Sequence, residues 1–199
     1  MSLVNQIRPT VVSLGVFTLL LGGFYPLATT GIVQAAFPHQ AQGSLIREGQ
    51  TVIGSDLIGQ NFTEAKYLWG RLSATAQAPY NAGASSGSNY GANNPALTEA
   101  AAARRGELGL SAPVPVDLLT ASGSGLDPHI SPAAAAVQVP RIAAARALPE
   151  DRVRAAIKAA TEARTFGILG EPRVNVLEVN LKLDRMPQSG PHLSESHVR

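Results

Sequence analysis

The sequence predicts an α+β protein: one N-terminal transmembrane helix followed by a small mixed α/β extracytoplasmic domain. Three observations predict this fold class. The chain opens with a long apolar segment without charge, proline-led and alanine-rich stretches predict helices further on, and short β-branched or alternating segments predict strands between them. The length of 199 residues suits one domain plus an anchor.

Composition excludes several classes of protein. The formal net charge is +2, and no run of five or six basic residues occurs, so nucleic-acid binding is not expected. The chain has no cysteine, which excludes disulfides, thiolate nucleophiles and zinc sites built from cysteine.

The membrane anchor is predicted over residues 9–33. No Asp, Glu, Lys or Arg occurs between Arg8 and Arg47, and the 23 residues from Val11 to Val33 are almost all apolar or small. A helix of that length spans about 35 Å and can cross a hydrocarbon core of about 30 Å. Arg8 precedes the span, so residues 1–8 are predicted to be cytoplasmic and the remainder to be exported.

A cleaved signal peptide is the alternative interpretation of this segment. Val33-Gln34-Ala35 resembles a cleavage site with small residues. The apolar core of a signal peptide usually has about 7–15 residues, and this one is longer, which favours a retained anchor.

One side of the predicted anchor carries small residues and a proline at steps of three or four. These residues are Gly15, Thr18, Gly22, Pro26 and Thr29. Small residues let transmembrane helices approach closely, so this side is a candidate partner-helix face, although glycine and threonine are also common in membrane helices generally. Pro26 predicts a kink near the outer end of the helix.

The exported domain is predicted over residues 40–184. It begins with a β hairpin at residues 44–62, turning at Glu48-Gly49, and the aromatic residues that follow are expected to pack in a core or an interface. A polar loop covers residues 73–94, and a loop of that length in a compact domain usually has a function. A second loop covers residues 121–131.

Helix and strand signals cover the rest of the domain. Asn94-Pro95 predicts a helix to about Leu108, Ser131-Pro132 predicts another of about fifteen residues, and a third begins at Pro149. The third helix is expected to bury Val153, Ile157 and Ala160. Two strands are predicted, at Val116–Thr120 and at Arg173–Leu183, the second with a bulge near Val176. The polar tail, residues 185–199, is predicted to be disordered.

The segment Ser122–His129 is the candidate for hydrolytic chemistry, with Ser124 as nucleophile and His129 as its base. Proximity in sequence says little about triad geometry, and the Gly-x-Ser-x-Gly pattern is absent. An ordered turn held by Asp127 and Ser131 is favoured instead. No Glu or His stands at helical spacing from His129, so neither a catalytic nor a metal site is expected.

The loop Ser85–Gly91 is a weak candidate for a phosphate cradle, through the backbone N–H groups of Ser86, Gly87, Ser88 and Asn89. It lacks the Gly-Lys-Ser/Thr ending of a P-loop, and no predicted strand directly precedes it. The predicted topology also places it in a space without ATP.

Seven segments in collinear order, over about residues 5–184, resemble the KdpC family, the C subunit of the bacterial potassium-transporting Kdp ATPase. They are Gly22-Gly23-Phe24-Tyr25-Pro26-Leu27, Gly43-Ser44-Leu45-Ile46-Arg47-Glu48-Gly49, Leu57-Ile58-Gly59-Gln60-Asn61-Phe62, Gly70-Arg71 with Ser73-Ala74-Thr75, Ser86-Gly87-Ser88-Asn89 with Asn94-Pro95, Thr120–Asp127 with Ser131-Pro132, and Gly170-Glu171-Pro172 with Val174–Leu183. Leu72, Ser86 and Tyr90 depart from the usual residues of the family.

The resemblance implies an accessory, non-catalytic subunit of a high-affinity potassium uptake pump in the bacterial inner membrane. It implies three protein partners: a channel-like A subunit, an ATP-hydrolysing B subunit and a small F peptide. Membrane lipid surrounds the anchor. The family is described as a catalytic chaperone that raises the ATP affinity of the B subunit, so ATP is expected only through the complex. The alternative function is a membrane-tethered nucleotide-binding or hydrolytic protein that uses the Ser122–His129 segment.

Overall fold

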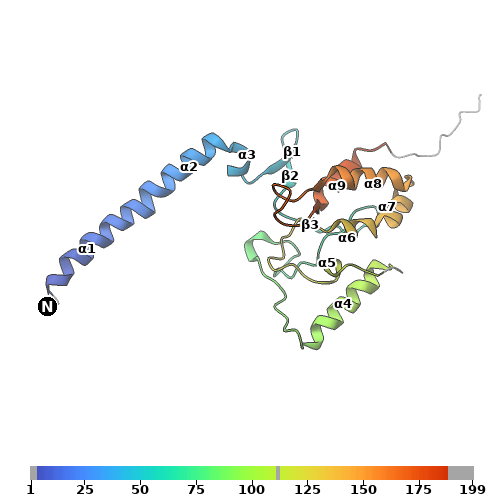
Figure 1. Cartoon of the computed structure of the whole chain (residues 1–199), viewed down its shortest axis with the longest axis horizontal. Coiled ribbons are helices and arrows are strands. Elements are labelled where there is room, and N and C mark those ends of the chain that lie inside the picture. The colour runs from blue at the N-terminus through green and yellow to red at the C-terminus, as the bar shows by residue number, and fades with distance from the viewer. Residues whose placement is uncertain (1–3, 111–112, 188–199) are drawn as a thin grey trace, which may run out of the picture. The chain divides into compact units, whose positions relative to one another are not determined.

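The computed structural model describes residues 4–110 and 113–187 (Figure 1). The chain divides into two compact units, an N-terminal unit of residues 1–53 and a C-terminal unit of residues 54–199, and each is described by itself. The tail that the sequence predicts to be disordered lies, from residue 188 onward, outside the described residues.

The N-terminal unit begins with one long apolar helix. It consists of α1 (Val4–Leu19), a π-helical turn η1 (Leu20–Phe24) and α2 (Tyr25–Ala36). Residues Asn5–Ala36 form a candidate membrane span of 32 residues with a mean hydropathy of 1.9. The predicted apolar helix is confirmed, and it extends beyond residues 9–33 at both ends.

A π turn directly precedes Tyr25-Pro26, and the kink predicted at Pro26 stays a prediction. The N–H of Tyr25 donates to the carbonyl of Leu20, five residues earlier, and Pro26 follows in the first turn of α2. A π turn inserts one residue into the helix, which displaces the later residues by up to about 100°, the rotation of one residue. Pro26 and Thr29 are therefore offset from the side defined by Gly15, Thr18 and Gly22. The partner-helix face itself stays a prediction.

A short helix and a hairpin follow the apolar helix. Helix α3 covers Pro38–Ala41, and strands β1 (Leu45–Glu48) and β2 (Thr51–Ser55) pair with each other. Gly49 lies in the turn with a φ of 59°, a conformation that favours glycine. The predicted hairpin is confirmed, and its turn lies at Gly49-Gln50, one residue later than the predicted Glu48-Gly49.

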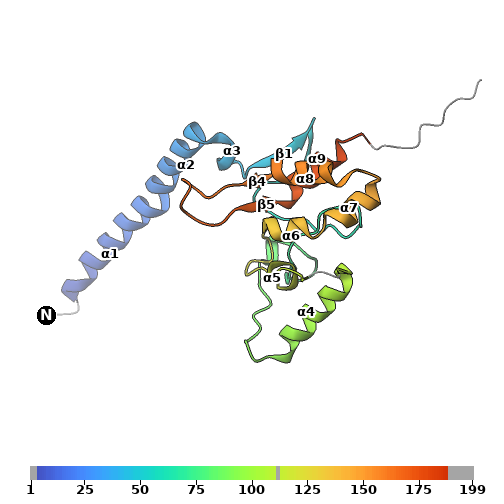
Figure 2. The same ribbon diagram turned by 45° about the vertical axis from the view of Figure 1, so that its right-hand side comes forward.

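The C-terminal unit contains short helices and a small antiparallel sheet (Figure 2). Its elements are η2 (Ala82–Ala84), α4 (Pro95–Leu108), α5 (Val116–Leu119), β3 (His129–Ile130), α6 (Pro132–Ala136), α7 (Val139–Arg146), α8 (Glu150–Ala159), β4 (Thr161–Glu162), β5 (Arg173–Asn175) and α9 (Val176–Asp184). The strand order is β3-β5-β4, with Ile130 and Thr161 both opposite Val174. Segments far apart in sequence thus meet at β5.

The core lies between the sheet and helices α6 to α9. Ile142, Val153, Val174 and Val179 are fully buried there. The predicted buried face of α8 is confirmed, since Val153, Ile157 and Ala160 are all buried. In both views α4 lies apart from α7, α8 and α9 (Figures 1 and 2).

Helix starts follow their local signals. The side chain of Asn94 accepts from the N–H of Ala96, and that of Ser131 accepts from the N–H of Ala134, each with proline at the next position. These caps confirm the predicted starts. The fifteen-residue helix predicted from Ser131-Pro132 is interrupted at residues 137–138, so that α6 and α7 are separate helices.

Both strands predicted in this unit are corrected. Val116–Leu119 is one helical turn, α5, and not a strand. In the segment Arg173–Leu183 only Arg173–Asn175 is extended, and α9 begins at Val176, where the sequence predicts a bulge. The side chain of Asn175 caps α9 by accepting from the N–H of Glu178. Residues 176, 179, 180 and 183 are buried, which is the spacing of one helix face.

Candidate functional site

The two long polar loops lie against each other and form one structure, here called the loop pair (residues 73–91 and 121–128). The carbonyl of Ser124 accepts from the N–H of Ser86 and from the hydroxyl of Ser85, both at 3.0 Å. The hydroxyl of Ser73 donates to the carbonyl of Gly125 at 2.7 Å. These contacts hold segments about forty to fifty residues apart in sequence, so the loops are ordered and are not a linker.

Glycines let the two backbones approach this closely. A Cβ atom at Gly87 would lie 2.9 Å from the carbonyl oxygen of Gly123. At Gly125, φ is 69° and a Cβ would lie 2.6 Å from Cγ2 of Thr75. Any side chain at either position would push the loops apart. The glycines that the sequence shows as a low-complexity stretch are therefore packing positions.

Tyr80 is at the base of the loop pair, in a space that two glycines leave open. Its hydroxyl donates to the carbonyl of Arg71 at 2.6 Å. A Cβ atom at Gly59 would lie 2.4 Å from the Tyr80 ring, and one at Gly70 would lie 2.7 Å from the Tyr80 hydroxyl. Burial raises the pKa of Tyr80 to about 12, against the opposing effect of Arg104. Tyr80 therefore stays neutral and structural.

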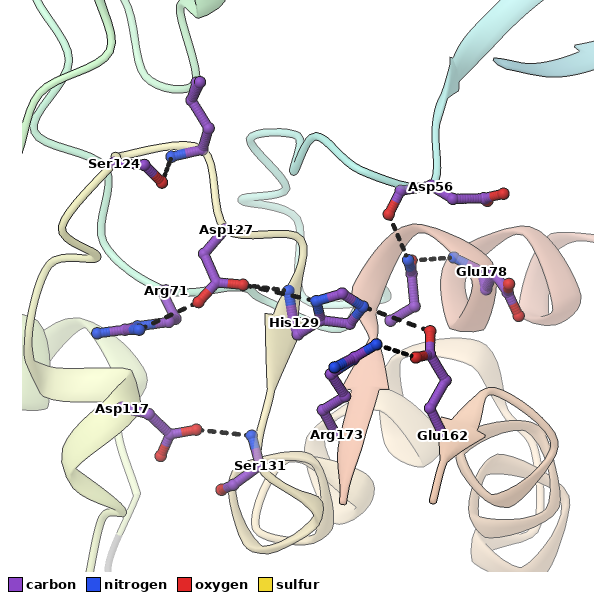
Figure 3. Close-up of polar contacts among 12 residues, drawn as sticks. Asp56, Arg71, Asp117, Ser124, Asp127, His129, Ser131, Glu162, Arg173 and Glu178 are labelled. Atoms are coloured by element: carbon purple, nitrogen blue, oxygen red, sulfur yellow. Dashed lines mark hydrogen bonds and ion pairs between the residues drawn. The ribbon is translucent and has the colours of Figure 1, made fainter. Parts of the chain in front are cut away.

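A chain of charged and ionisable side chains runs from the loop pair across the sheet (Figure 3). Arg71 donates to Oδ2 of Asp127 at 3.1 Å, and Oδ1 of Asp127 accepts from the N–H of His129 at 2.9 Å. Burial disfavours the charged form of Asp127, but the bonds from His129 and Arg71 outweigh it and lower the pKa of Asp127 below its usual value.

The imidazole of His129 lies between two carboxylates. Its Nδ1 is 3.7 Å from Asp127, and its Nε2 is 3.5 Å from Glu162, which also pairs with Arg173. The buried Nε2 has no hydrogen bond of good geometry, and the contact with Glu162 becomes an ion pair only when the ring is protonated. The contact joins a side chain of β3 to one of β4.

A cavity of about 440 Å³ borders the charged chain and the loop pair. It is lined by Leu57, Ile58, Arg71, Ser122, Gly123, Ser124, Leu126, Asp127 and Pro128. Nε of Arg71 and Oγ of Ser122 are buried nearby without a hydrogen-bond partner. These unpaired polar atoms suit water or a polar ligand in the cavity. The ion pair of Arg71 with Asp127 holds two opposite charges at the cavity wall.

The structure does not bring the hydrolase candidates together. Oγ of Ser124 accepts from the N–H of Leu126 at 3.1 Å, while the His129 ring contacts Asp127 and Glu162. Figure 3 shows Ser124 and His129 on opposite sides of Asp127. Within residues 4–110 and 113–187 no group of three His, Asp or Glu side chains is arranged to hold a metal ion.

The phosphate-cradle candidates are partly used inside the fold. The N–H of Ser86 donates to Ser124, and Gly87 packs on the backbone of Gly123. Ser88 lines a separate cavity of about 160 Å³ beside Leu97 and Leu119, while Asn89 is exposed with a φ of 52°. At least one N–H of the proposed cradle is thus unavailable to an anion.

Two buried amides that sequence reasoning missed hold the segment before the loop pair. Gln138, fully buried, bonds both the N–H and the carbonyl of Trp69, at 2.9 and 3.1 Å. Asn180 does the same for Leu68. Their only signal in the sequence is a polar residue among apolar ones, Asn180 within α9 and Gln138 in the turn before α7. Arg141 lies beside these amides and stacks on the Trp69 ring. Burial, and secondly the positive charge of Arg104, lower the pKa of Arg141 to about 10.

Comparison with known proteins completes the description of the site. Residues 7–185 match the family described as "KdpC: K+-transporting ATPase, c chain". Proteins named potassium-transporting ATPase KdpC subunit are similar over most of this chain. The one from Methylococcus capsulatus is 55% identical over 92% of this chain and 100% of its own length. The one from Sorangium cellulosum is 56% identical over 90% and 97%. With a match that spans the apolar helix, the loop pair and α9, the chain belongs to the KdpC family.

Proposed function

We propose that this chain is the accessory, non-catalytic C subunit of an ATP-driven potassium pump. The observation that carries the proposal is the family match over residues 7–185, which includes both the apolar helix and the loop pair. The chain would assemble with a channel-like A subunit, an ATP-hydrolysing B subunit and a small F peptide. The relatives named as subunits of a potassium-transporting ATPase support this assignment.

The proposed topology is a single pass through the bacterial inner membrane. Residues 1–8 are cytoplasmic, residues 9–33 cross the bilayer, and residues 40–184 form the extracytoplasmic domain. Support comes from the apolar span Asn5–Ala36 and from Arg8, a positive charge near its N-terminal end. Membrane lipid then contacts the anchor wherever the partner helices do not.

The proposed role is assembly and coupling. The loop pair is an ordered polar surface, and the Ser124 and His129 side chains face different neighbours. In the proposed topology ATP lies across the membrane from this domain, so we propose no directly bound nucleotide or metal. An effect on the ATP affinity of the B subunit, the catalytic-chaperone role, would act through a conformational equilibrium shared by the subunits.

Affinity purification of the tagged full-length chain from native membranes tests the assembly role. The three partner subunits should co-purify with an uncleaved chain. The variant Gly22→Leu should reduce their yield, and Gly23→Leu is the matched control. Both glycines lie in the π turn, and a Cβ at either meets no atom of this chain within 4 Å, so a difference reports a partner. If the chain purifies alone or without its first 35 residues, the proposal is wrong.

Enzyme kinetics of the assembled pump test the coupling role. Gly87→Ala forces the loops apart at the Gly123 carbonyl, and the KM for ATP should rise while the subunits still co-purify. Gly91→Ala, at a glycine whose Cβ meets nothing within 4 Å, is the control. An unchanged KM with a displaced loop pair would contradict the coupling role and leave assembly standing.

A further inference from the structure

The loop between β4 and β5 ends in an apolar tip, here the β4–β5 tip (residues 165–169). Phe166 is 89% exposed, Ile168 is 74% exposed and Leu169 is 57% exposed. Three large apolar side chains within four residues are costly to leave in water, and grouped exposed apolar residues usually mark a surface that is covered in the working protein.

The tip is an ordered structure. Thr165 and Leu169 exchange two backbone hydrogen bonds of 2.9 Å, and the N–H groups of Gly167 and Ile168 donate to Arg164 and Thr165. Phe166 has a φ of 54°, a conformation that a bulky residue rarely adopts. The backbone thus holds the Phe166 side chain outward, and four N–H groups of the tip already have partners inside the loop.

The charge distribution around the tip suits a lipid surface. No charged residue occurs from Thr165 to Gly170. Arg164 and Glu171 on the stem pair with each other at 2.6 Å, and Arg173 pairs with Glu162. An apolar tip with four bonded N–H groups, above neutralised charges, can enter the wet head-group region at a small desolvation cost.

The connection between the apolar helix and the hairpin is short. Helix α2 ends at Ala36 and β1 begins at Leu45, so residues 37–44 connect them. Eight residues reach at most about 29 Å when fully extended. This step rests on the proposed function, in which α2 crosses the membrane. In that topology the hairpin that leads into the C-terminal unit starts within about 29 Å of the end of α2.

We propose that the β4–β5 tip inserts into the outer head-group region of the lipid bilayer and is a second membrane contact of this chain, besides the apolar helix. Phe166, Ile168 and Leu169 supply the inserted surface. The paired Arg164 and Glu171 remain at the level of the phosphates.

A site-specific fluorescent label tests the inference. The chain has no cysteine, so Phe166→Cys carries a single environment-sensitive label in the full-length protein. The protein is placed in nanodiscs of phosphatidylethanolamine and phosphatidylglycerol, with or without nitroxide lipids quenching at the head-group end of the acyl chain. Label at residue 166 should shift to the blue and lose about half its intensity to these lipids. The control is Val116→Cys, at a residue 70% exposed in α5, where neither change is expected.

Further measurements separate the outcomes. In the Phe166→Cys background, Ile168→Asn with Leu169→Asn should restore the emission of a label in water, whereas Ile168→Leu should not. A label at 166 that behaves like the label at 116 overturns the inference. A label that is shielded only in the assembled pump, without nitroxide quenching, also overturns it and shows that a partner subunit covers the tip. Co-purification of the pump subunits, scored on the same samples, reports separately on the proposed function.

Discussion

The side-chain amide of Asn180 bonds both backbone polar groups of Leu68: its Oδ1 accepts from the Leu68 N–H at 2.8 Å, and its Nδ2 donates to the Leu68 carbonyl at 3.0 Å. A neighbouring β strand would make the same pair of bonds. Leu68 is fully buried and lies in no helix or strand, so this amide satisfies a backbone that would otherwise be buried without partners.

Replacing this amide should destabilise the domain. Asn180→Leu leaves the N–H and carbonyl of Leu68 buried without partners, at a cost of about 3 kcal/mol in the free energy of unfolding. Urea unfolding of the full-length protein in detergent, followed by fluorescence of the single tryptophan Trp69, measures the loss. Asn93→Leu, at an exposed position, is the control and should change stability by less than about 0.5 kcal/mol. Equal stability of the two variants would contradict the role given to Asn180.

Gly70 and Tyr80 should be energetically coupled. A Cβ at Gly70 would meet the Tyr80 hydroxyl at 2.7 Å, and the next nearest atoms are 3.8 Å away. Gly70→Ala alone should cost about 1–3 kcal/mol by overpacking. In the background of Tyr80→Phe, which lacks the hydroxyl, most of that cost should vanish.

A double-mutant cycle with the same unfolding assay measures this coupling. Tyr80→Phe by itself should cost about 1 kcal/mol, because the carbonyl of Arg71 loses its hydrogen bond. Additive effects of the two substitutions would show that Gly70 is not kept open for Tyr80.

Asp127 should contribute to stability in a pH-dependent way. Its pKa is lowered in the folded protein, so the folded state favours the carboxylate. The contribution is present above the unfolded pKa of about 3.9 and is lost as the pH falls through the lower folded value. Urea unfolding between about pH 6 and pH 2 should therefore show a steeper acid loss for the wild type than for Asp127→Asn. The control is Glu99→Gln, on the exposed surface of α4. If Glu99→Gln flattens the acid limb as much as Asp127→Asn does, the bonds of Asp127 are not the cause.

Replacing Ser124 or His129 separates the pump-subunit function from the hydrolase alternative, because the two predict opposite results. Ser124→Ala removes only an acceptor for the Leu126 N–H, and His129→Gln keeps a polar side chain between Asp127 and Glu162. We expect potassium-limited growth of cells that depend on this pump to stay within about twofold of wild type. Loss of a nucleophile or its base would lower turnover by about 10⁴-fold or more. A growth defect of that size, with normal assembly of the pump, would support the hydrolase alternative.

Local signals in the sequence were sufficient for several elements. The caps at Asn94 and Ser131 act within four residues, and the hairpin turn at Gly49 needs only its own backbone. The apolar helix is defined by composition alone, because a bilayer selects long uncharged segments. Each of these features depends on residues that are close together in the chain, which is why they were predictable.

Segments whose pattern fits two periods were not predictable. In Val176–Asp184 the apolar residues alternate like a strand and also recur at helical spacing. The cap from Asn175 and the packing of α9 against α8 and β5 select the helix. Val116–Leu119 is similar: four residues are too few for periodicity to separate a helical turn from a strand.

The sequence determined the anchor, the positions of the main helices and, through seven collinear motifs, the family. Only the tertiary structure decided that the two glycine-rich loops pack as one body, that Ser124 and His129 face different neighbours, and that Gln138 and Asn180 hold an extended segment. The reason is physical. The contacts between the loops and those of Gln138 and Asn180 join residues about 40 to 110 positions apart, and their geometry depends on the packed core that brings them together.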